Sequence, residues 1–369
     1  MTTNRLASDL DDILARTEPL WRDLRGQRIM ITGATGFFGC WLLESFAWAN
    51  DRLNLHARVV GVVRHPEVLT KKAPHLAQNP AISFHAADVR TDDFPLGKFS
   101  HVIHAATEAS AKLNFDAPLE MFETIVEGTR RALQFSVDGS AARFLLVSSG
   151  AVYGIQPPQL THVSESFTGG PDALDPANAY AEGKRAAELL CSLAASPRFA
   201  TTVARCFAFV GPGMKLDAHF AIGNFIGDRL RQCPIRVQGD GTAVRSYLYA
   251  SDLMVWLWTI LFKGQSRRAY NVGSEEALDI ANLAREVAAA LPPEVAVDIA
   301  STETPGSPVH RYVPSTARAR RELGLSAEVP LREAIYRTHR WFSENPSAEH
   351  AISDARISRP EVFARGTHA

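Results

Sequence analysis

The sequence predicts an α/β protein built on a doubly wound parallel sheet. Short apolar segments of strand length alternate with amphipathic segments of helix length from residue 27 to about residue 210. A glycine-rich turn at residues 33–39 directly follows the first of these strands and opens a helix. Such alternation produces a parallel sheet covered on both faces, and the right-handed crossover rule then yields the Rossmann arrangement. The regular alternation of strands and helices ends at residues 211–213, Gly-Pro-Gly. The change predicts a smaller C-terminal α/β substrate-binding domain.

Composition narrows the class of protein. The 369 residues are 46% apolar and 21% charged, which is ordinary for a soluble globular chain. The formal net charge of −1 predicts no attraction to nucleic acid or to an anionic membrane surface. No apolar run reaches the roughly 18 residues of a membrane helix, and the N-terminus lacks the apolar stretch of a secretory signal. The four cysteines are scattered without zinc-ligand spacing, so we expect no metal site and a cytoplasmic protein with reduced thiols.

Four regions are predicted along the chain. Residues 1–26 are an N-terminal helical extension, in which apolar residues recur at three-to-four spacing between positions 5 and 25. Residues 27–210 form the doubly wound domain, residues 211–345 mainly the substrate-binding domain with some return to the sheet, and residues 346–369 a tail. We interpret the extension as a cap that packs on the fold; a lid or a dimer arm is the alternative.

Within the doubly wound domain, strands are predicted at residues 28–32, 58–63, 82–85, 101–105, 143–148 and 201–207, and helices at residues 37–49, 118–135 and 179–195. In the second domain, helices are predicted at residues 220–231, 252–262, 280–291 and 315–323, and short strands at residues 235–237, 245–249 and 269–272. Asp252 opens one of these helices, and we interpret it as the N-cap.

The glycine-rich turn predicts a dinucleotide cofactor. Residues 33–39 have the pattern G-x-x-G-x-x-G between a strand and a helix. Glycines allow a tight turn and a close backbone approach to a pyrophosphate, which the helix N-terminus attracts. The residues expected to hold the NAD or NADP at this turn are Gly33, Thr35, Gly36, Phe37, Phe38 and Gly39.

The ends of the next three strands predict the rest of the cofactor site. No acid follows the second strand to bind a ribose 2′-hydroxyl, and Arg64 beside that place favours the 2′-phosphate of NADP. A solvated arginine at a strand end is the alternative. Asp88 and Val89 after the third strand are expected to meet the adenine. Residues 104–106, His104, Ala105 and Ala106, end the fourth strand and leave room for the cofactor; for His104, a satisfied strand-end histidine is the alternative.

Tyr180 and Lys184 stand four residues apart in a predicted helix, so their side chains lie on one face. A lysine ammonium beside a phenol favours the phenolate and lowers the pKa of the tyrosine from about 10. The pair predicts a general base that works near neutral pH. With a dinucleotide in the same chain, the natural chemistry is hydride transfer at a carbinol or ketone.

These features together resemble the extended short-chain dehydrogenase/reductase superfamily, in its NAD-dependent epimerase/dehydratase group that acts on nucleotide sugars. The resemblance covers about residues 27–325. Its marks are GATGFFG at 33–39, DVR at 88–90, HAA at 104–106, SSGAVYG at 148–154, YAEGK at 180–184, GP at 211–212 and RSYLYASD at 245–252. It implies that Tyr180 is the acid/base, that Lys184 lowers the pKa of Tyr180 and holds the cofactor ribose, and that Ser149 binds the reacting oxygen. It also implies a nucleotide-sugar substrate and a homodimer built from the helices around 118–135 and 179–195.

The resemblance extends to the substrate site only in part. Arg245 corresponds to an arginine on the sugar-nucleotide diphosphate, since a guanidinium matches phosphate oxygens. The family asparagine three residues before the Gly-Pro turn is Ala208 here, so His219 or Asn224 is the candidate substitute, with capping or packing as the alternative for Asn224. Arg311 is the nearest candidate for a second diphosphate arginine. Substrate contacts are also expected at Ser149 and Tyr153.

One departure bears on the reaction. Sugar 4,6-dehydratases of this group carry acidic residues directly after the serine, where this chain has Gly150 and Ala151, and neither residue can transfer a proton. This argues against 4,6-dehydration. The favoured reaction is that of a nucleoside diphosphate-sugar 4-epimerase, and the alternative is an NADPH-dependent 4-keto-sugar reductase, which Arg64 favours. A dehydratase, a non-sugar carbonyl reductase and a catalytically silent nucleotide-binding protein are the remaining alternatives.

Overall fold

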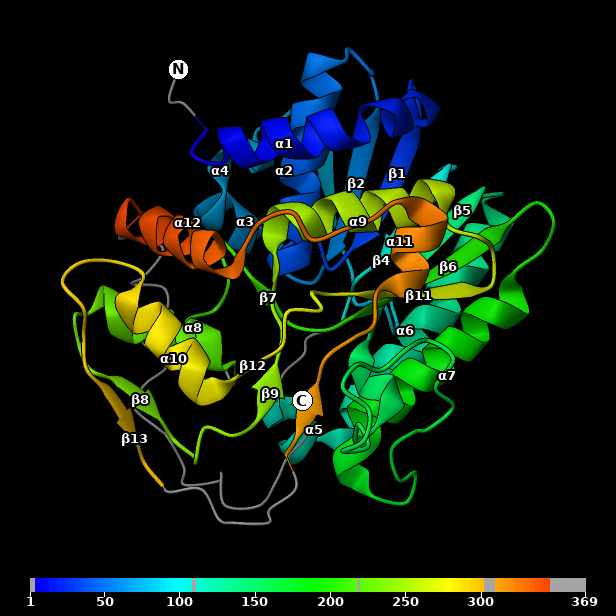
Figure 1. The fold of residues 1–369 in the computed structure, drawn as a ribbon. Helices are drawn as coiled ribbons and strands as arrows, with labels where there is room; N and C mark the ends of the chain where they lie inside the picture. Colours follow the sequence, from blue (N-terminus) through cyan, green and yellow to red (C-terminus); the bar gives the residue numbers. More distant parts are fainter. Residues whose placement is uncertain (1–3, 108–110, 218–219, 302–308, 346–369) are drawn as a thin grey trace.

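A seven-stranded parallel sheet forms the centre of the molecule (Figure 1). The computed structural model describes residues 4–107, 111–217, 220–301 and 309–345. The strand order is β11-β6-β5-β4-β1-β2-β3. The strands are β1 (Arg28–Thr32), β2 (Arg58–Val63), β3 (Ile82–Ala86), β4 (His101–His104), β5 (Arg143–Ser149), β6 (Ala200–Cys206) and β11 (Arg268–Val272). The predicted doubly wound fold is confirmed, and its strand order reverses between β1 and β4, where α/β sheets bind ligands.

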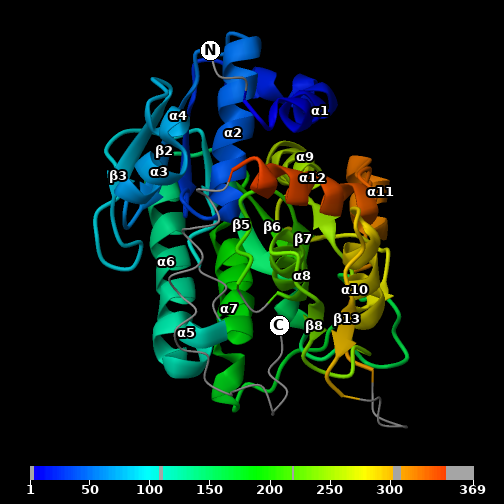
Figure 2. The same cartoon turned by 90° about the vertical axis from the view of Figure 1, so that its left-hand side faces the viewer.

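One face of the sheet is covered by two long helices, α6 (Pro118–Asp138) and α7 (Ala179–Ala194), which lie side by side in Figure 2. The short α5 (Ala111–Asp116) precedes them. Apolar residues of these helices, such as Ile125 and Ala187, form one buried cluster with Met30, Val102 and Phe144 of the sheet. This packing fixes α7, and with it Tyr180 and Lys184, against the ends of β5 and β6.

The other face is covered by α1 (Ala7–Thr17), α2 (Phe37–Arg52), α9 (Ala250–Lys263) and α11 (Ala317–Leu323). The N-terminal extension is not one helix over residues 5–25: α1 ends at Thr17 and a 3₁₀ helix, η1 (Glu18–Leu24), follows. Pro19 falls at this break, where a ring without an N–H cannot continue the α-helical ladder. Leu10, Ile13 and Trp21 are fully buried, so the extension packs on the fold as a cap.

Asp252 is not the N-cap of α9. Tyr249 occupies the N-cap position, and Asp252 lies inside the first turn. The Asp252 carboxylate accepts hydrogen bonds from Arg16 at 2.6 Å and from the backbone N–H groups of Glu328 and Val329 at 3.0 Å. Its side chain is completely buried, so it joins α1 and the backbone of residues 328–329 to α9.

The second region consists of three small sheets and their helices, on the side of the molecule away from α6 in Figure 2. Its elements are β7 (Phe209–Val210), α8 (Ala221–Leu230), β8 (Ile235–Val237), β9 (Val244–Arg245), β10 (Leu248–Tyr249), β12 (Leu278–Asp279), α10 (Ile280–Ala289), β13 (Val297–Ile299), β14 (Arg311–Tyr312) and α12 (Leu331–Ser343). The predicted strand 245–249 is split, because β9 pairs with β12 and β14 whereas β10 pairs with β7. The predicted strand 269–272 is β11, which lies beside β6 in the large sheet. The domain boundaries themselves stay a prediction.

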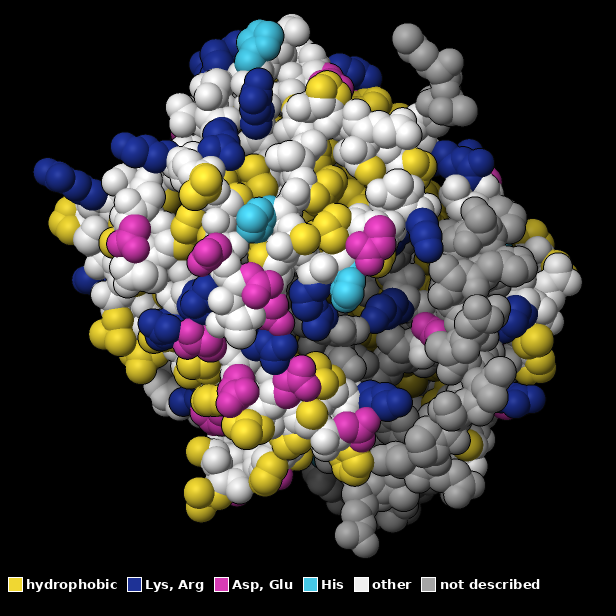
Figure 3. All heavy atoms as spheres, turned by 180° about the vertical axis from the view of Figure 1, so that it is seen from behind, with side chains coloured by type: hydrophobic (Ala, Val, Ile, Leu, Met, Phe, Trp, Pro, Cys, Tyr) yellow, Lys and Arg dark blue, Asp and Glu magenta, His cyan; other side chains and the backbone are white. Residues whose placement is uncertain are grey.

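Three short helices complete the fold: α3 (Glu67–Lys72), α4 (Pro74–Ala77) and the 3₁₀ helix η2 (Gly150–Tyr153); a further 3₁₀ turn, η3 (Pro176–Asn178), precedes α7. Basic and acidic side chains are interspersed over most of the described surface seen in Figure 3. In the described part of the chain, no helix combines the length and apolar character needed to cross a membrane. The predicted tail, residues 346–369, lies outside the described residues.

Candidate active site

The glycine-rich turn lies at the carboxyl end of β1. Gly33 has a φ of +72°, and a Cβ there would lie 2.5 Å from the carbonyl oxygen of Ala105. A Cβ on Gly39 would lie 2.4 Å from the Cα of Ala34, so both positions require glycine. Gly36 is the exposed N-cap residue of α2, whose first turn leaves backbone N–H groups without helical partners. This Cβ-free surface fits the pyrophosphate of a dinucleotide.

The phenylalanines of the turn point their rings into the protein. The Phe38 ring meets Phe209 edge to face with centroids 5.2 Å apart, and Phe37 packs against two core clusters. Thr35 is half-buried, and its carbonyl accepts the thiol of Cys40. The rings therefore anchor the turn, and a cofactor contact at Thr35, Phe37 and Phe38 stays a prediction that rests on their backbone.

His104 is buried beneath this turn. Its Nδ1 lies 2.8 Å from the hydroxyl of Thr32, and that hydroxyl oxygen accepts the backbone N–H groups of Ala105 and Ala106. Since both acceptor positions of Thr32 are used, its proton goes to Nδ1, and the neutral ring carries its own proton on Nε2. Burial, and next the charge of Lys184, lower the pKa of His104 to about 3. The ring is bonded through Nδ1, its buried Nε2 has no hydrogen-bond partner among the described residues, and the Thr32 hydroxyl holds the backbone of Ala105 near Gly33. The predicted room for a cofactor beside His104 stays a prediction.

The predicted adenosine end contains an ion pair. Arg90 donates from Nη2 to Asp88 at 2.8 Å, and this pairing lowers the pKa of Asp88. Arg64 is exposed, and its charge also acts on Asp88. Val89 is buried against α6, where a Cβ on Gly128 would lie 2.8 Å from it. Contacts of Arg64, Asp88 and Val89 with a cofactor stay predictions.

Tyr180 and Lys184 lie one turn apart on α7, with the lysine Nζ 5.8 Å from the tyrosine ring centroid. The side chain of Asn114 holds the first turn of α7 by accepting the N–H of Tyr180 at 3.0 Å. Lys184 is buried and donates to the carbonyl of Val147 at 2.8 Å. Burial lowers the pKa of Lys184 to about 8 and raises the pKa of Tyr180 to about 12, against the opposing effect of a hydrogen bond with Ser149. In this arrangement the Lys184 ammonium is bound to Val147 and desolvation dominates the pKa of Tyr180, so the lowering of this pKa by Lys184 stays a prediction.

Ser149 ends β5 and brings a second tyrosine to the same place. Its Oγ accepts the N–H of Ala151 at 3.1 Å and lies 3.4 Å from the hydroxyl of Tyr312, in addition to the hydrogen bond with Tyr180. Sequence reasoning missed Tyr312 and chose its neighbour Arg311. The local sequence around Tyr312 carries only a weak signal of a site residue. Its position becomes visible once β14 pairs with β9, which places Tyr312 beside Arg245.

Gly150 makes room for this tyrosine. A Cβ on Gly150 would lie 2.7 Å from the Phe207 ring and 2.8 Å from the Tyr312 hydroxyl. The rings of Phe207 and Tyr312 lie 4.6 Å apart. The space beside Ser149 that an acidic side chain at position 150 would enter is therefore filled by these two aromatic residues.

The predicted diphosphate arginines differ in placement. Arg245 is half-buried on β9 and donates from Nη1 to the carbonyls of Val244 and His310. Burial lowers its pKa. Adjacent residues of a strand point to opposite faces, so Arg311 is directed away from the face on which Tyr312 meets Ser149. A contact of Arg311 with a diphosphate stays a prediction.

The remaining predicted substrate residues are scattered. Tyr153 is buried, and its hydroxyl donates to Asn271 at 2.7 Å and accepts from Arg205 at 2.9 Å, which fits a structural role. Asn224 is half-buried in the first turn of α8, and its substrate contact stays a prediction. His219 lies outside the described residues.

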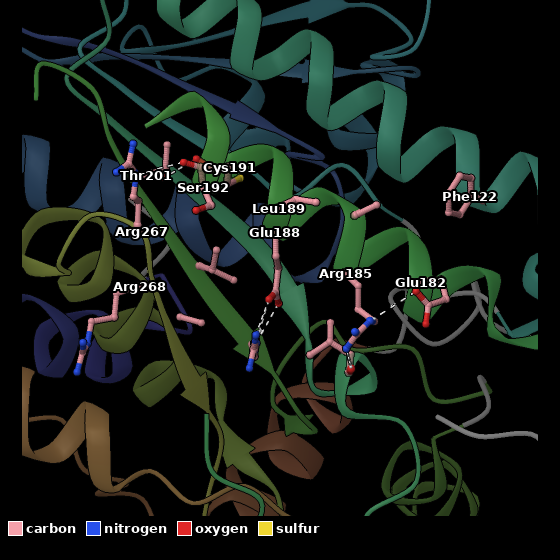
Figure 4. Close-up of a pocket in the computed structure, with 15 residues that line it drawn as sticks. Phe122, Glu182, Arg185, Glu188, Leu189, Cys191, Ser192, Thr201, Arg267 and Arg268 are labelled. Atoms are coloured by element: carbon pink, nitrogen blue, oxygen red, sulfur yellow. Dashed lines mark hydrogen bonds and ion pairs between the residues drawn. The ribbon is translucent and has the colours of Figure 1, made fainter. Parts of the chain in front are cut away.

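A groove of about 600 Å³ opens on the outer side of α7, against β6 and β11 (Figure 4). Its floor holds the ion pair of Arg205 and Glu188, 2.6 Å apart, and Glu188 also accepts the hydroxyl of Ser148 at 2.6 Å. Ser149, Tyr180 and Lys184 do not line this groove, so it is separate from the catalytic cluster. Within the described ranges, no three His, Cys, Asp or Glu side chains gather in a way that could hold a metal ion.

Comparison with known proteins agrees with this geometry. The chain is 29% identical over 321 residues to UDP-glucuronic acid decarboxylase 2 of Arabidopsis thaliana, covering 86% of this chain and 68% of the relative. It is 27% identical over 337 residues to UDP-glucuronic acid decarboxylase 1 of Xenopus tropicalis, covering 91% and 76%. Among solved structures, UDP-glucose 4-epimerase of Thermotoga maritima with UDP-glucose has a TM-score of 0.71 at 21% identity, covering 86% of this chain and 99% of that one. The dTDP-glucose 4,6-dehydratase DesIV of Streptomyces venezuelae, with NAD bound, has a TM-score of 0.73 at 23% identity, covering 87% and 98%.

The family model for the NAD dependent epimerase/dehydratase family matches residues 29–273, which includes the turn, Ser149, Tyr180 and Lys184. The resemblance seen in the sequence motifs is confirmed: this chain belongs to the NAD-dependent epimerase/dehydratase family.

Proposed function

We propose that this protein oxidises a carbinol of a nucleoside diphosphate sugar, with C4 as the reacting carbon, and that it returns the hydride to give the C4 epimer. The observation that carries the proposal is the convergence of Ser149 and Tyr180 beside Lys184, at the sheet edge that holds the glycine-rich turn. A dinucleotide bound at that turn supplies a hydride acceptor and donor for the sugar carbon.

The residues of the chain handle the proton. In the oxidation, Tyr180 as phenolate takes the proton of the sugar hydroxyl, and Ser149 donates a hydrogen bond to the same oxygen. The pKa of Tyr180, about 12, must fall for this step. We infer that the Lys184 ammonium turns from the Val147 carbonyl toward Tyr180 when substrate and cofactor fill the site, because a nearby cation favours the phenolate. In the reduction, Tyr180 returns the proton.

The missing acid argues for epimerisation over dehydration. Elimination of water from a 4-keto sugar needs a base at C5 and an acid for the leaving hydroxyl, whereas epimerisation needs only the proton carrier on the C4 oxygen. Gly150 and Ala151 supply neither group, and the space beside Gly150 is filled by Phe207 and Tyr312.

Decarboxylation is the second candidate, because the relatives described above are named UDP-glucuronic acid decarboxylases. Oxidation at C4 places a C5 carboxylate β to the new ketone. The bond to the carboxylate then breaks: its electron pair moves into the enolate, CO₂ leaves, and C5 takes up a proton from solvent. Return of the hydride to C4 completes the UDP-pentose. The same three residues, Ser149, Tyr180 and Lys184, support this reaction.

The test combines cofactor and substrate analysis of the purified protein. It is denatured, the released nucleotides are identified by mass spectrometry, and intact protein is incubated with UDP-glucose or with UDP-glucuronic acid and followed by proton NMR. Bound NAD and formation of UDP-galactose without added cofactor would support the epimerase. Release of CO₂ with a UDP-pentose would support the decarboxylase. Stoichiometric NADPH consumption with a 4-keto sugar nucleotide would replace both with the reductase.

A further inference from the structure

A hydroxyl outside the set predicted from the sequence lies against the catalytic serine. The Tyr312 hydroxyl is 3.4 Å from the Oγ of Ser149 and 3.4 Å from the carbonyl oxygen of Cys206. Ser149 also accepts the N–H of Ala151 at 3.1 Å and shares a hydrogen bond with Tyr180. Three hydroxyls, on β5, β14 and α7, thus form a chain that ends at the proposed proton carrier.

Counting donors and acceptors leaves two arrangements of this chain. A serine hydroxyl has one proton and two acceptor positions. In the first arrangement, Ala151 and Tyr312 both donate to Ser149, and the serine proton is directed to Tyr180 or to the substrate oxygen. In the second arrangement, Ser149 donates to Tyr312, which donates to the Cys206 carbonyl, and the serine proton is not available for the reaction.

We propose that Tyr312 is a positioning residue of the reaction, which donates to Ser149 and thereby commits the single serine proton to Tyr180 or to the reacting oxygen. The inference rests on the proposed function, in which Tyr180 or the substrate oxygen carries negative charge during the reaction. That negative charge favours the first arrangement. A charge-assisted hydrogen bond is stronger than a neutral one, so the developing charge selects the arrangement that stabilises it.

The residues around Tyr312 hold its hydroxyl beside Ser149. Its ring packs on Phe207 with centroids 4.6 Å apart, and Gly150 lacks the Cβ that would lie 2.8 Å from its hydroxyl. The parallel pairing of β14 with β9 places the backbone of Tyr312 in register with Arg245. Burial raises the pKa of Tyr312, so its hydroxyl keeps the proton that it donates to Ser149.

The variant Tyr312→Phe tests the proposal, because it keeps the ring packing on Phe207 and removes only the hydroxyl. We expect kcat to fall about tenfold, which is the effect of losing about one net hydrogen bond, while KM stays within about twofold. We also expect the kinetic pKa on the acid side of the kcat profile to rise by about half a unit to one unit, because the phenolate of Tyr180 is stabilised less. The matched control is Tyr270→Phe on β11. It removes a hydroxyl that is bound to the Gln265 N–H and to Glu322 of α11, away from Ser149.

The proposal is overturned if Tyr312→Phe leaves kcat and its pH profile as in the wild type, or if Tyr270→Phe changes them equally. A second readout needs no substrate. The seven tyrosines are replaced biosynthetically by fluorotyrosine, which titrates at lower pH, and the fluorine resonance of Tyr180 is assigned from Tyr180→Phe. Tyr312→Phe should move this titration to higher pH. The shift without turnover of any tested sugar would refute only the proposed function; turnover without the shift would refute only the positioning role.

Discussion

At the scale of single residues, the pKa values in the catalytic cluster depend on burial as much as on which residues form the cluster. Tyr180 and Lys184 have the expected spacing, yet desolvation moves their pKa values toward the neutral forms, to about 12 and about 8. At neutral pH the site without ligands therefore holds a neutral Tyr180 beside a Lys184 that is still mainly an ammonium, and the phenolate of Tyr180 must be stabilised as the reaction proceeds. This is a common property of buried catalytic groups, whose pKa values depend on what enters the site.

The variant Tyr180→Phe should lower kcat by about 10²- to 10⁴-fold, because it removes the group that carries the proton and retains the ring. Dinucleotide affinity, measured by isothermal calorimetry, should stay within error of the wild type. The conservative comparison is Tyr153→Phe, which also loses a buried phenol but from the structural network with Asn271 and Arg205. Full activity of Tyr180→Phe would refute the mechanism.

Arg64 tests the choice between the two cofactors. If it contacts a 2′-phosphate, Arg64→Ala should weaken NADP binding by about tenfold or more and leave NAD binding nearly unchanged, because a charge-assisted hydrogen bond is lost only with NADP. Fluorescence titration with both reduced cofactors measures this ratio, with the exposed Arg58 of β2, as Arg58→Ala, for a control. An equal effect on both cofactors would place Arg64 outside the pocket.

His104 makes stability depend on pH in a defined window. Its pKa is about 3 in the folded protein against an ordinary value of 6.5, so between these values the unfolded chain binds more protons. The stability that His104 contributes is complete above about pH 6.5 and is lost as the pH falls toward 3. His101, whose pKa burial lowers to about 4, acts in the same direction.

Chemical denaturation at several pH values checks this expectation. The loss of unfolding free energy between pH 6.5 and 4 should be less steep in His104→Asn than in the wild type, and unchanged in a variant of the exposed His65. Equal slopes for the wild type and His104→Asn would contradict the buried neutral imidazole.

At the scale of elements, α1 and α9 are joined by an ion pair that the sequence pattern did not reveal. The Asp252 side chain is completely buried, and Arg16 is its charged partner at 2.6 Å. Breaking a buried pair from one side leaves an uncompensated charge, so Arg16→Met should lower the free energy of unfolding by about 3 kcal/mol. Arg130→Met, which removes an exposed partner of Glu127, should have almost no effect in the same denaturation experiment. Equal losses in the two variants would mean that water screens the Arg16 pair.

Prediction of elements succeeded where hydrophobic period and turn residues agree, as in β1, α6 and α7. It failed at Pro19, a local helix breaker that divides the N-terminal extension, and where pairing between distant strands decides the path. Ser246 and Tyr247 carry the chain from the sheet of β9 to the sheet of β10, which splits the predicted strand. Helix α12 received no prediction, although its buried residues Leu331, Ile335 and Phe342 follow the helical period.

At the scale of the whole molecule, an apolar surface on α5, α6 and α7 supports the predicted homodimer. We call this surface the helical face; its exposed members are Phe115, Leu119, Leu189 and Leu193, which are 60–72% exposed. Exposed apolar residues on neighbouring helices mark an association surface where they form a contiguous patch. The dimer stays a prediction.

Charged substitutions on the helical face should separate the subunits, because an unpaired carboxylate in an apolar interface is strongly unfavourable. Leu189→Glu combined with Leu193→Glu should sediment as a monomer at micromolar concentration where the wild type sediments as a dimer. Leu96→Glu, at a loop residue that is 93% exposed, is the control and should leave the dimer intact. A wild-type monomer under these conditions would refute the dimer.

The sequence by itself determined the fold class, the glycine-rich turn and the Tyr180/Lys184 pair, because each depends on a short stretch whose period or glycine spacing is readable along the chain. The tertiary structure decided what those residues experience. Tyr312 meets Ser149 across 163 positions of sequence. The direction of the Tyr180 pKa follows from burial that no local pattern encodes, and Asp252 binds Arg16 from 236 positions away. Local pattern specifies secondary structure and motif, whereas desolvation and long-range hydrogen bonding exist only once the chain is packed.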